Sequence, residues 1–294
     1  MTRNLGYSYR LQLDKKAIGH TTLSFLSSRF RHSTEAEWAV RIEEGQVLVN
    51  DKIAEESQLL LAGMIMIWNR PGWTEEETPQ KFAVEFEDEQ LLAVSKPSGL
   101  PTLPGAGFYL NTLLNLVRSR YPSARPLHRL GRGTSGLVLF ALTHEAARSL
   151  TRGWEKVEKQ YQALGSFHAR HDEYDIRSQI GLMDHPRLGR VYAAVVDGKQ
   201  ARSVARPLKR CDNSTLFEID LHTGRPHQIR IHLATIGHPL VGDPLYARDG
   251  QLLDSPGLPG DLGYLLHAKR LELEHPFTHK RLEIWSELPQ ELIA

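Results

Sequence analysis

Near the start of the chain, hydrophobic residues recur first at helical spacing and then at strand spacing. Residues 21–30 place apolar side chains on one face of a predicted helix, and residues 35–44 form a second helix that a glycine ends. Residues 46–54 alternate as two strands around an Asn-Asp turn. This pattern predicts a small module of two helices and a hairpin over residues 15–73, an arrangement common among RNA-binding units.

After an acidic, proline-containing stretch at 74–81, which we interpret as a linker, the pattern shifts toward strands. We expect a hairpin within 82–101, further strands at 135–142, 159–167, 214–223, 265–276 and 280–288, and helices at 111–121, 144–155 and 226–237. Runs of strands with few helices indicate the α+β class. The sequence therefore predicts a larger domain over 82–294 with a mixed, largely antiparallel sheet.

Composition limits the setting in which the chain works. Among 294 residues there is one cysteine, Cys211, which excludes an internal disulfide framework and favours a reducing compartment. The first residues lack the apolar core of a secretion signal, and no later run approaches the roughly 20 apolar residues of a membrane span. We expect a cytoplasmic protein with no membrane partner, and a monomer.

Charge is distributed unevenly although the net charge is only +1. Residues 90–144 contain no Asp or Glu, yet they include Lys96, Arg118, Arg120, Arg125, Arg129 and Arg132. A solvated surface normally mixes both signs, so this segment is predicted to line an anion site. The anion would be a phosphate backbone or a phosphorylated small molecule.

Arginine and histidine are concentrated in two stretches, "LHRLGRGTSG", which includes His128, and "TGRPHQIRIH". In the second, Arg225, His227, Gln228 and Arg230 open a predicted helix, and a helix N-terminus with flanking cations favours a phosphate or carboxylate. Buried guanidinium groups need paired anions, so some of these arginines should meet a ligand. The alternative interpretation is a solvated face.

Other chemistries fit the sequence poorly. The glycine-rich stretches lack the Gly-Lys-Ser/Thr ending of a nucleotide-binding loop. His227 and His232 are five residues apart, which places them on different helix faces, and no cysteine cluster completes a zinc site. Ser135 does not stand in nucleophile-elbow spacing. We expect neither a metal nor a cofactor.

Five segments carry a family resemblance: "AVSKPSGLPTLPG", "HRLGRGTSGLVLFA", "EKQYQAL", "TGRPHQIRIHLATIGHPLVGDPLY" and "LLHAKRLELEHP". Their order and spacing over residues 82–290 resemble the RluA-type RNA pseudouridine synthases. Residues 21–73 likewise resemble the ribosomal-protein-type RNA-binding module that many of these synthases carry. The resemblance implies isomerisation of uridine to pseudouridine in RNA, ribosomal or transfer, without cofactor or metal.

The resemblance also implies roles for single residues. Arg129 would fill the space left by a uridine flipped out of its stack, and Tyr161 would stack on the uracil and assist proton removal. Arg230 would hold the catalytic carboxylate, while Leu130 and Leu266 would line the pocket. The RNA would be bound by Lys96, His128, Arg129, Arg132, Arg225, His227 and Gln228.

The carboxylate itself is missing from the motif. Family members carry an Asp at the position of Gly131, where it acts on the ribose or the base. Glycine cannot act so, and Asp243 in "VGDPLY" is the best-placed substitute by motif proximity. Three interpretations stay open: a synthase with a displaced carboxylate or altered mechanism, a silent RNA-binding relative, and a binder of a phosphorylated small molecule. The sequence does not select the target RNA or uridine.

Overall fold

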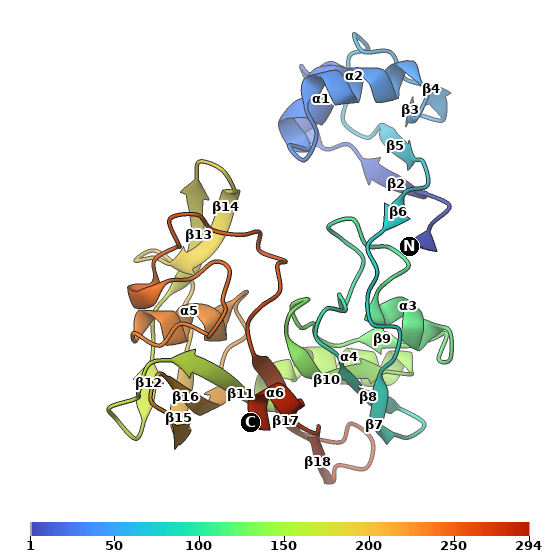
Figure 1. Ribbon diagram of the computed structural model, residues 1–294. Coiled ribbons are helices and arrows are strands. Elements are labelled where there is room, and N and C mark those ends of the chain that lie inside the picture. Colours follow the sequence, from blue (N-terminus) through green and yellow to red (C-terminus); the bar gives the residue numbers. More distant parts are fainter. Residues whose placement is uncertain (1, 294) are drawn as a thin grey trace. The chain divides into compact units, whose positions relative to one another are not determined.

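A computed structural model describes residues 2–293 and divides the chain into two compact units, the first ending at Glu75 and the second beginning at Glu76 (Figure 1). No helix within 2–293 combines the length and apolar character needed to cross a membrane.

The first unit is a four-stranded antiparallel sheet with two helices. The strands follow the order β2 (Tyr7–Gln12), β5 (Ile65–Arg70), β3 (Val47–Val49) and β4 (Lys52–Ile53). The helices are α1 (Thr22–Arg29) and α2 (Glu35–Glu43), with a 3-10 turn η1 (Lys15–Ala17) before them. Thr21 and Thr34 each form a capping box that satisfies helix-start N–H groups. The two predicted helices and the predicted hairpin are all present.

The first unit extends past the predicted 15–73 at both ends. Strand β2 precedes residue 15 and pairs with β5 along its full length. Strand β6 (Thr74–Glu75) pairs with β1 (Thr2–Arg3), so residues 74 and 75 belong to this unit and not to a linker. The sequence analysis missed β1 and β6 because each is only two residues long. It also passed over β2, although Tyr7, Tyr9 and Leu11 alternate there with polar residues.

The second unit is built on a ten-stranded sheet with the order β12-β15-β16-β11-β17-β10-β8-β7, and with β9 paired to β10 and β18 paired to β17. The strands are β7 (Ala83–Glu87), β8 (Leu91–Lys96), β9 (Arg125–Pro126), β10 (Ser135–Ala141), β11 (Glu158–Ser166), β12 (Tyr174–Ile176), β15 (Ser203–Arg210), β16 (Ser214–Leu221), β17 (Leu266–Glu274) and β18 (Arg281–Trp285). Within it β10 and β17 run parallel and the other pairs are antiparallel. The predicted α+β class is confirmed.

Both faces of the sheet are covered around β10, whose seven residues are all buried. Val138 and Phe140 pack in a cluster that includes residues of α3 (Leu113–Arg118) and α5 (Gln228–Thr235). Leu137 and Leu139 face the opposite cluster, which includes residues of α4 (His144–Arg152). This explains why β10 is continuously apolar from Leu137 to Ala141 instead of alternating. Other elements are the hairpin β13 (Ile180–His185) and β14 (Gly189–Ala194), the turns η2 (Trp154–Lys156) and η3 (Arg248–Gly250), and α6 (Gln290–Ile293).

Helix α5 begins later than predicted. It starts at Gln228, with His227 as N-cap in the left-handed region at φ 56°, so Pro226 is not its first residue. Arg225 and His227 therefore precede the helix instead of lying in its first turn. Gly237, with φ 86°, follows the C-cap residue as the sequence predicted.

Candidate active site

The adjacent strands β11, β17 and β10 bring three of the sequence motifs together. Tyr161 on β11 pairs with Ala268 on β17, and Ser135 on β10 pairs with His267. The parallel pairing of β10 with β17 depends on Gly136, because a Cβ at this position would lie 2.3 Å from the carbonyl oxygen of Ala268. The loop that ends at Ser135 is thereby fixed next to the strand that follows "LGYL".

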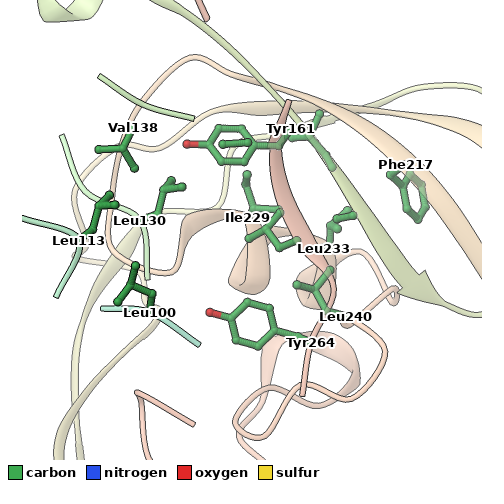
Figure 2. Packing of buried hydrophobic residues seen from close by; sticks show 14 of the residues in the cluster. Leu100, Leu113, Leu130, Val138, Tyr161, Phe217, Ile229, Leu233, Leu240 and Tyr264 are labelled. Carbon is green, nitrogen blue, oxygen red and sulfur yellow. The ribbon is translucent and has the colours of Figure 1, made fainter. Parts of the chain in front are cut away.

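Leu130, Tyr161 and Leu266 are 7%, 7% and 6% exposed and belong to one buried cluster that also contains Tyr264. Figure 2 shows the hydroxyls of Tyr161 and Tyr264 pointing toward the same side of the cluster. Burial raises the pKa of the Tyr161 phenol, so it is neutral at physiological pH. Within 2–293 its hydroxyl has no hydrogen-bond partner.

Arg230 lies in this region, and its guanidinium is already paired with a carboxylate of the protein. Its Nε and Nη2 donate to the two oxygens of Asp243 at 2.7 Å each. Burial opposes the charge on Arg230, yet the hydrogen bonds and charge of Asp243 outweigh it and raise the pKa of the guanidinium. The remaining nitrogen, Nη1, is buried without a partner in the described part of the chain.

The proposed substitute role of Asp243 is not supported by this geometry. Besides holding Arg230, its Oδ1 accepts from the backbone N–H groups of Leu245 and Tyr246 at 2.9 and 3.1 Å. The side chain is 1% exposed, so both oxygens are committed to a turn and an ion pair. Asp243 therefore stabilises the fold around Arg230 and leaves no oxygen for a sugar.

Gly131 is exposed, and the space beside it is occupied by another residue. A Cβ at this position would lie 3.3 Å from the Tyr264 hydroxyl and 3.6 Å from Thr134 Oγ1. With a glycine in place of the family's Asp, this space would be expected to be open or to hold water or an anion. The phenol of Tyr264 reaches it instead.

Lys96, predicted to bind RNA, is fully buried. Its Nζ donates to the carbonyl oxygens of Pro97, Leu100 and Arg132 at 2.9, 2.7 and 3.2 Å. Burial, with a smaller contribution from the Arg132 charge, lowers the pKa of Lys96 to about 7. The RNA-binding prediction was wrong because this amine ties two loops together from inside.

The two arginines of the loop behave differently. Arg132 ion-pairs with Glu76, donates from Nε to the Gly99 carbonyl at 3.1 Å and lies over the Phe108 ring. Arg129 is exposed and makes no hydrogen bond or ion pair to any residue in 2–293. Arg132 therefore has a structural role, whereas the charge of Arg129 is exposed and unpaired within 2–293.

His128 serves the fold, contrary to its predicted RNA contact. Its Nε2 accepts from the backbone N–H of Leu139 at 3.0 Å, and its ring stacks on Trp154 with 4.8 Å between centroids. Burial lowers the pKa of His128 to about 3, which keeps the acceptor nitrogen unprotonated.

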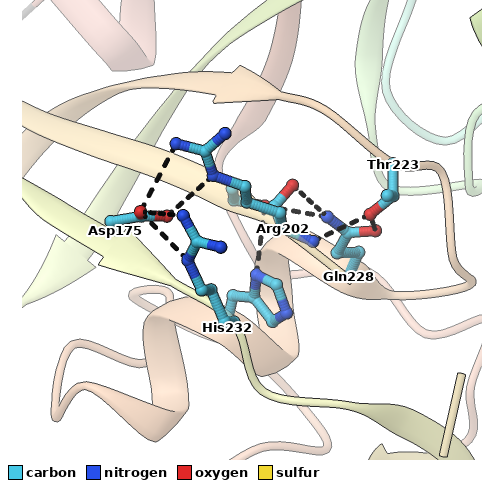
Figure 3. Close-up of polar contacts among 7 residues, drawn as sticks. Asp175, Arg202, Thr223, Gln228 and His232 are labelled. Carbon is cyan, nitrogen blue, oxygen red and sulfur yellow. Dashed lines mark hydrogen bonds and ion pairs between the residues drawn. The ribbon is translucent and has the colours of Figure 1, made fainter. Parts of the chain in front are cut away.

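The side chains just before α5 and at its first residue also bond within the protein. Gln228 is buried and bonds to the Thr223 hydroxyl, the Arg202 carbonyl and the Ser203 hydroxyl. Figure 3 shows part of this network. Arg225 Nε donates to the Gln200 carbonyl at 3.0 Å. His227 Nδ1 lies 2.8 Å from the Tyr246 hydroxyl, and burial lowers the pKa of His227 to about 4. Gln228 is closed to RNA, whereas Arg225 and His227 are only partly buried.

Sequence reasoning missed Tyr264, and one signal for it was available. Glycines at 131 and 133 on both sides of Arg132 leave room for a large side chain from elsewhere. Within 2–293 no group of three His, Cys, Asp or Glu side chains could hold a metal ion.

Comparison with known proteins places this site in a family. Residues 90–235 match the model of the RNA pseudouridylate synthase family. An uncharacterized RNA pseudouridine synthase of Synechocystis is 40% identical over 92% of this chain and 95% of its own. RNA pseudouridine synthase 5 of Oryza sativa is 36% identical over 98% of this chain and 88% of its own. Ribosomal large subunit pseudouridine synthase D of Nitrosomonas europaea is 39% identical over 71% of this chain and 62% of its own.

Solved structures agree on the fold. Human RNA pseudouridylate synthase domain containing 1 superposes with a TM-score of 0.57 at 24% identity, over 74% of this chain and 87% of its own. Human RNA pseudouridylate synthase domain containing 4 superposes with a TM-score of 0.54 at 22% identity, over 72% of this chain and 90% of its own. With three of the motifs meeting on adjacent strands and relatives matching nearly the whole chain, this protein belongs to the RNA pseudouridine synthase family, whose members are isomerases acting on RNA.

Proposed function

We propose that this chain converts particular uridines of a structured RNA, ribosomal or transfer RNA, to pseudouridine after flipping the target base out of its stack. The observation that carries the proposal is the convergence of Tyr161, Leu130 and Leu266 in one cluster next to Arg230, from four separate segments. A neutral phenol with a free hydroxyl above an apolar floor suits a planar, uncharged uracil. In this proposal Tyr161 stacks on the base and assists the later removal of its proton.

Arg129 is proposed to enter the stack where the flipped base was. It is the exposed cation of the loop, and no residue within 2–293 forms a hydrogen bond or ion pair with it. Flipping costs a few kcal/mol, which contacts to phosphate must offset. Partly buried Arg225 and His227, just before α5, are further candidates for such contacts.

The first unit is proposed to dock on RNA as well. It contains a cavity of about 490 Å³ lined by Ser27, Ser28, Arg31, His32, Ser33, Thr34, Glu35 and Glu37. The hydroxyls and the Arg31 guanidinium of this open hollow suit the phosphates and 2′-hydroxyls of a folded RNA, while Glu35 and Glu37 limit how closely a phosphate can approach them.

A silent RNA-binding relative is the second candidate, and Gly131 is the observation that favours it. One experiment separates the two. RNA from cells that lack this chain, labelled with tritium at uracil C5, is incubated with the pure protein. Isomerisation releases the tritium to water, whereas RNA binding without release would show a silent relative. Mapping the modified position then identifies the target RNA.

A further inference from the structure

The phenol of Tyr264 lies against both glycines of the loop "GRG". A Cβ at Gly131 would lie 3.3 Å from its hydroxyl, and a Cβ at Gly133 would lie 2.9 Å from Cζ, 3.0 Å from Cε1 and 3.1 Å from the hydroxyl. Real Cβ atoms almost never approach other atoms within 3.0 Å. The ring can therefore occupy this place only because residue 133 has no side chain.

Backbone conformation does not explain these glycines. Neither Gly131 nor Gly133 adopts a left-handed φ, whereas Gly136 in the same loop does, at 102°. An ordinary residue could adopt the backbone of either position. The space that the two missing side chains leave is used by Tyr264.

The same ring also lies next to a fixed cation. The guanidinium carbon of Arg230 lies 4.3 Å from the Tyr264 ring centroid, and Asp243 holds that guanidinium through two hydrogen bonds. The hydroxyl lies 3.4 Å from Thr134 Oγ1, a long contact that leaves it free for a shorter one.

We propose that Tyr264 replaces the missing carboxylate and acts on the flipped nucleotide at exposed Gly131. The inference rests on the proposed function. Its basis is that the side-chain oxygen nearest to the absent Cβ of residue 131 is the Tyr264 hydroxyl. The residue arrives from the segment before β17, more than 130 positions later in the chain.

The reaction balances with this one group. The bond between ribose C1′ and uracil N1 breaks, its electron pair stays with uracil, and the Tyr264 hydroxyl gives its proton to N1. The resulting phenolate stabilises the positive charge on C1′. After uracil has turned, a bond forms between C5 and C1′, and the C5 proton moves, with the assistance of Tyr161, to the phenolate of Tyr264. The sum transfers one proton from C5 to N1 and restores the phenol.

The test compares Tyr264→Phe with the full chain in tritium release from RNA labelled at uracil C5, prepared from cells lacking this protein. Removing a general acid and base should lower kcat by about 100-fold or more. The affinity for RNA should change less than threefold, because the ring and its contact with Arg230 are kept. Tyr121→Phe is the matched control: its hydroxyl bonds to Glu87 on the surface, and its activity should equal that of the parent.

A second variant distinguishes chemistry from packing. In Tyr264→Phe the space beside residue 131 is free of the hydroxyl. The double variant Tyr264→Phe with Gly131→Asp should therefore release tritium at least ten times faster than Tyr264→Phe alone. A structural defect would not be repaired by a carboxylate. Either a single variant with more than a third of the parental rate or a double variant without recovery would overturn the role of Tyr264. A parent that releases no tritium from any RNA would instead overturn the proposed function and this inference together.

Discussion

Arg230 and Asp243 form a bidentate ion pair in which Nε and Nη2 each lie 2.7 Å from a carboxylate oxygen, and the two side chains are 3% and 1% exposed. The pair fixes the guanidinium between the rings of Tyr246 and Tyr264, at 5.1 and 4.3 Å from their centroids. Arg230 is thus positioned by the fold before any RNA arrives.

Asp243→Ala should reduce the free energy of unfolding by about 3–5 kcal/mol, because it leaves a buried guanidinium uncompensated. Urea unfolding of the full chain measures the effect. Asp212→Ala, at an exposed carboxylate, should stay within about 0.5 kcal/mol of the parent. A loss below 1 kcal/mol for Asp243→Ala would mean that Arg230 finds another partner or moves to solvent.

Gly133→Ala should displace Tyr264, because the new methyl group would lie 2.9 Å from Cζ of the ring. Overpacking of this kind costs about 1–3 kcal/mol in unfolding free energy. Tritium release should fall as the hydroxyl moves from residue 131. Gly153→Ala, where the nearest atom is 3.8 Å away, is the matched control and should alter neither quantity by much. An active, fully stable Gly133→Ala protein would contradict the tight seat of the ring.

Arg129→Ala should weaken RNA binding and reduce the slope of log affinity against log salt by about 0.7–0.9, the contribution of one neutralised phosphate. Arg132→Ala should act mainly on stability, because that guanidinium is held by Glu76 and Gly99. Binding measured between 50 and 200 mM salt separates the two, with exposed Arg152→Ala as reference. Equal salt slopes for Arg129→Ala and the parent would remove Arg129 from the interface.

Stability should fall in acid partly through His128, whose pKa is lowered from 6.5 to about 3 by burial. Between these values the unfolded chain binds the proton that the folded chain excludes, so the free energy of unfolding rises with pH. The slope from this group is at most about 1.4 kcal/mol per pH unit. His128→Gln should flatten the profile between pH 6 and 4, while exposed His222→Gln should not. Parallel profiles for all three proteins would show that His128 is protonated in the folded state.

A chain that begins at residue 76 should fold cooperatively, because the second unit has its own core and sheet. A chain that begins at residue 82 should be less stable, since Glu76 binds Arg132 and its carbonyl accepts from Asn111. Thermal unfolding of the two truncated chains tests this difference. Aggregation of the longer one would show that the first unit is required for folding.

Periodicity predicted the elements that depend on local pattern, and it failed where tertiary contacts decide. Helix α4 begins after Thr143 as expected, because a cap is a local signal. Pro226 suggested the start of α5, but His227 turns into the left-handed region and bonds to Tyr246, nineteen residues later. Short strands such as β1 and β6 carry no period that a sequence could reveal.

The site was predicted in its residues more than in their roles. Motif spacing placed Tyr161, Leu266 and Arg230 in one region, because strand order follows from the fold of the family. Lys96 was assigned to RNA from charge alone, and charge does not reveal that three carbonyls surround it inside the protein. Tyr264 lies in no charged or polar motif, and only coordinates bring it to Gly131.

The buried amine of Lys96 also bears on how tightly RNA can bind. Its hydrogen bonds to Pro97, Leu100 and Arg132 fix two loop backbones that would otherwise lose conformational freedom when a nucleotide arrives. Ordering a loop residue costs about 1–2 kcal/mol of backbone entropy, and here that loss occurs during folding. Association with RNA should therefore show a small ordering entropy on the protein side, and most of the entropic cost should come from the unstacked nucleotide.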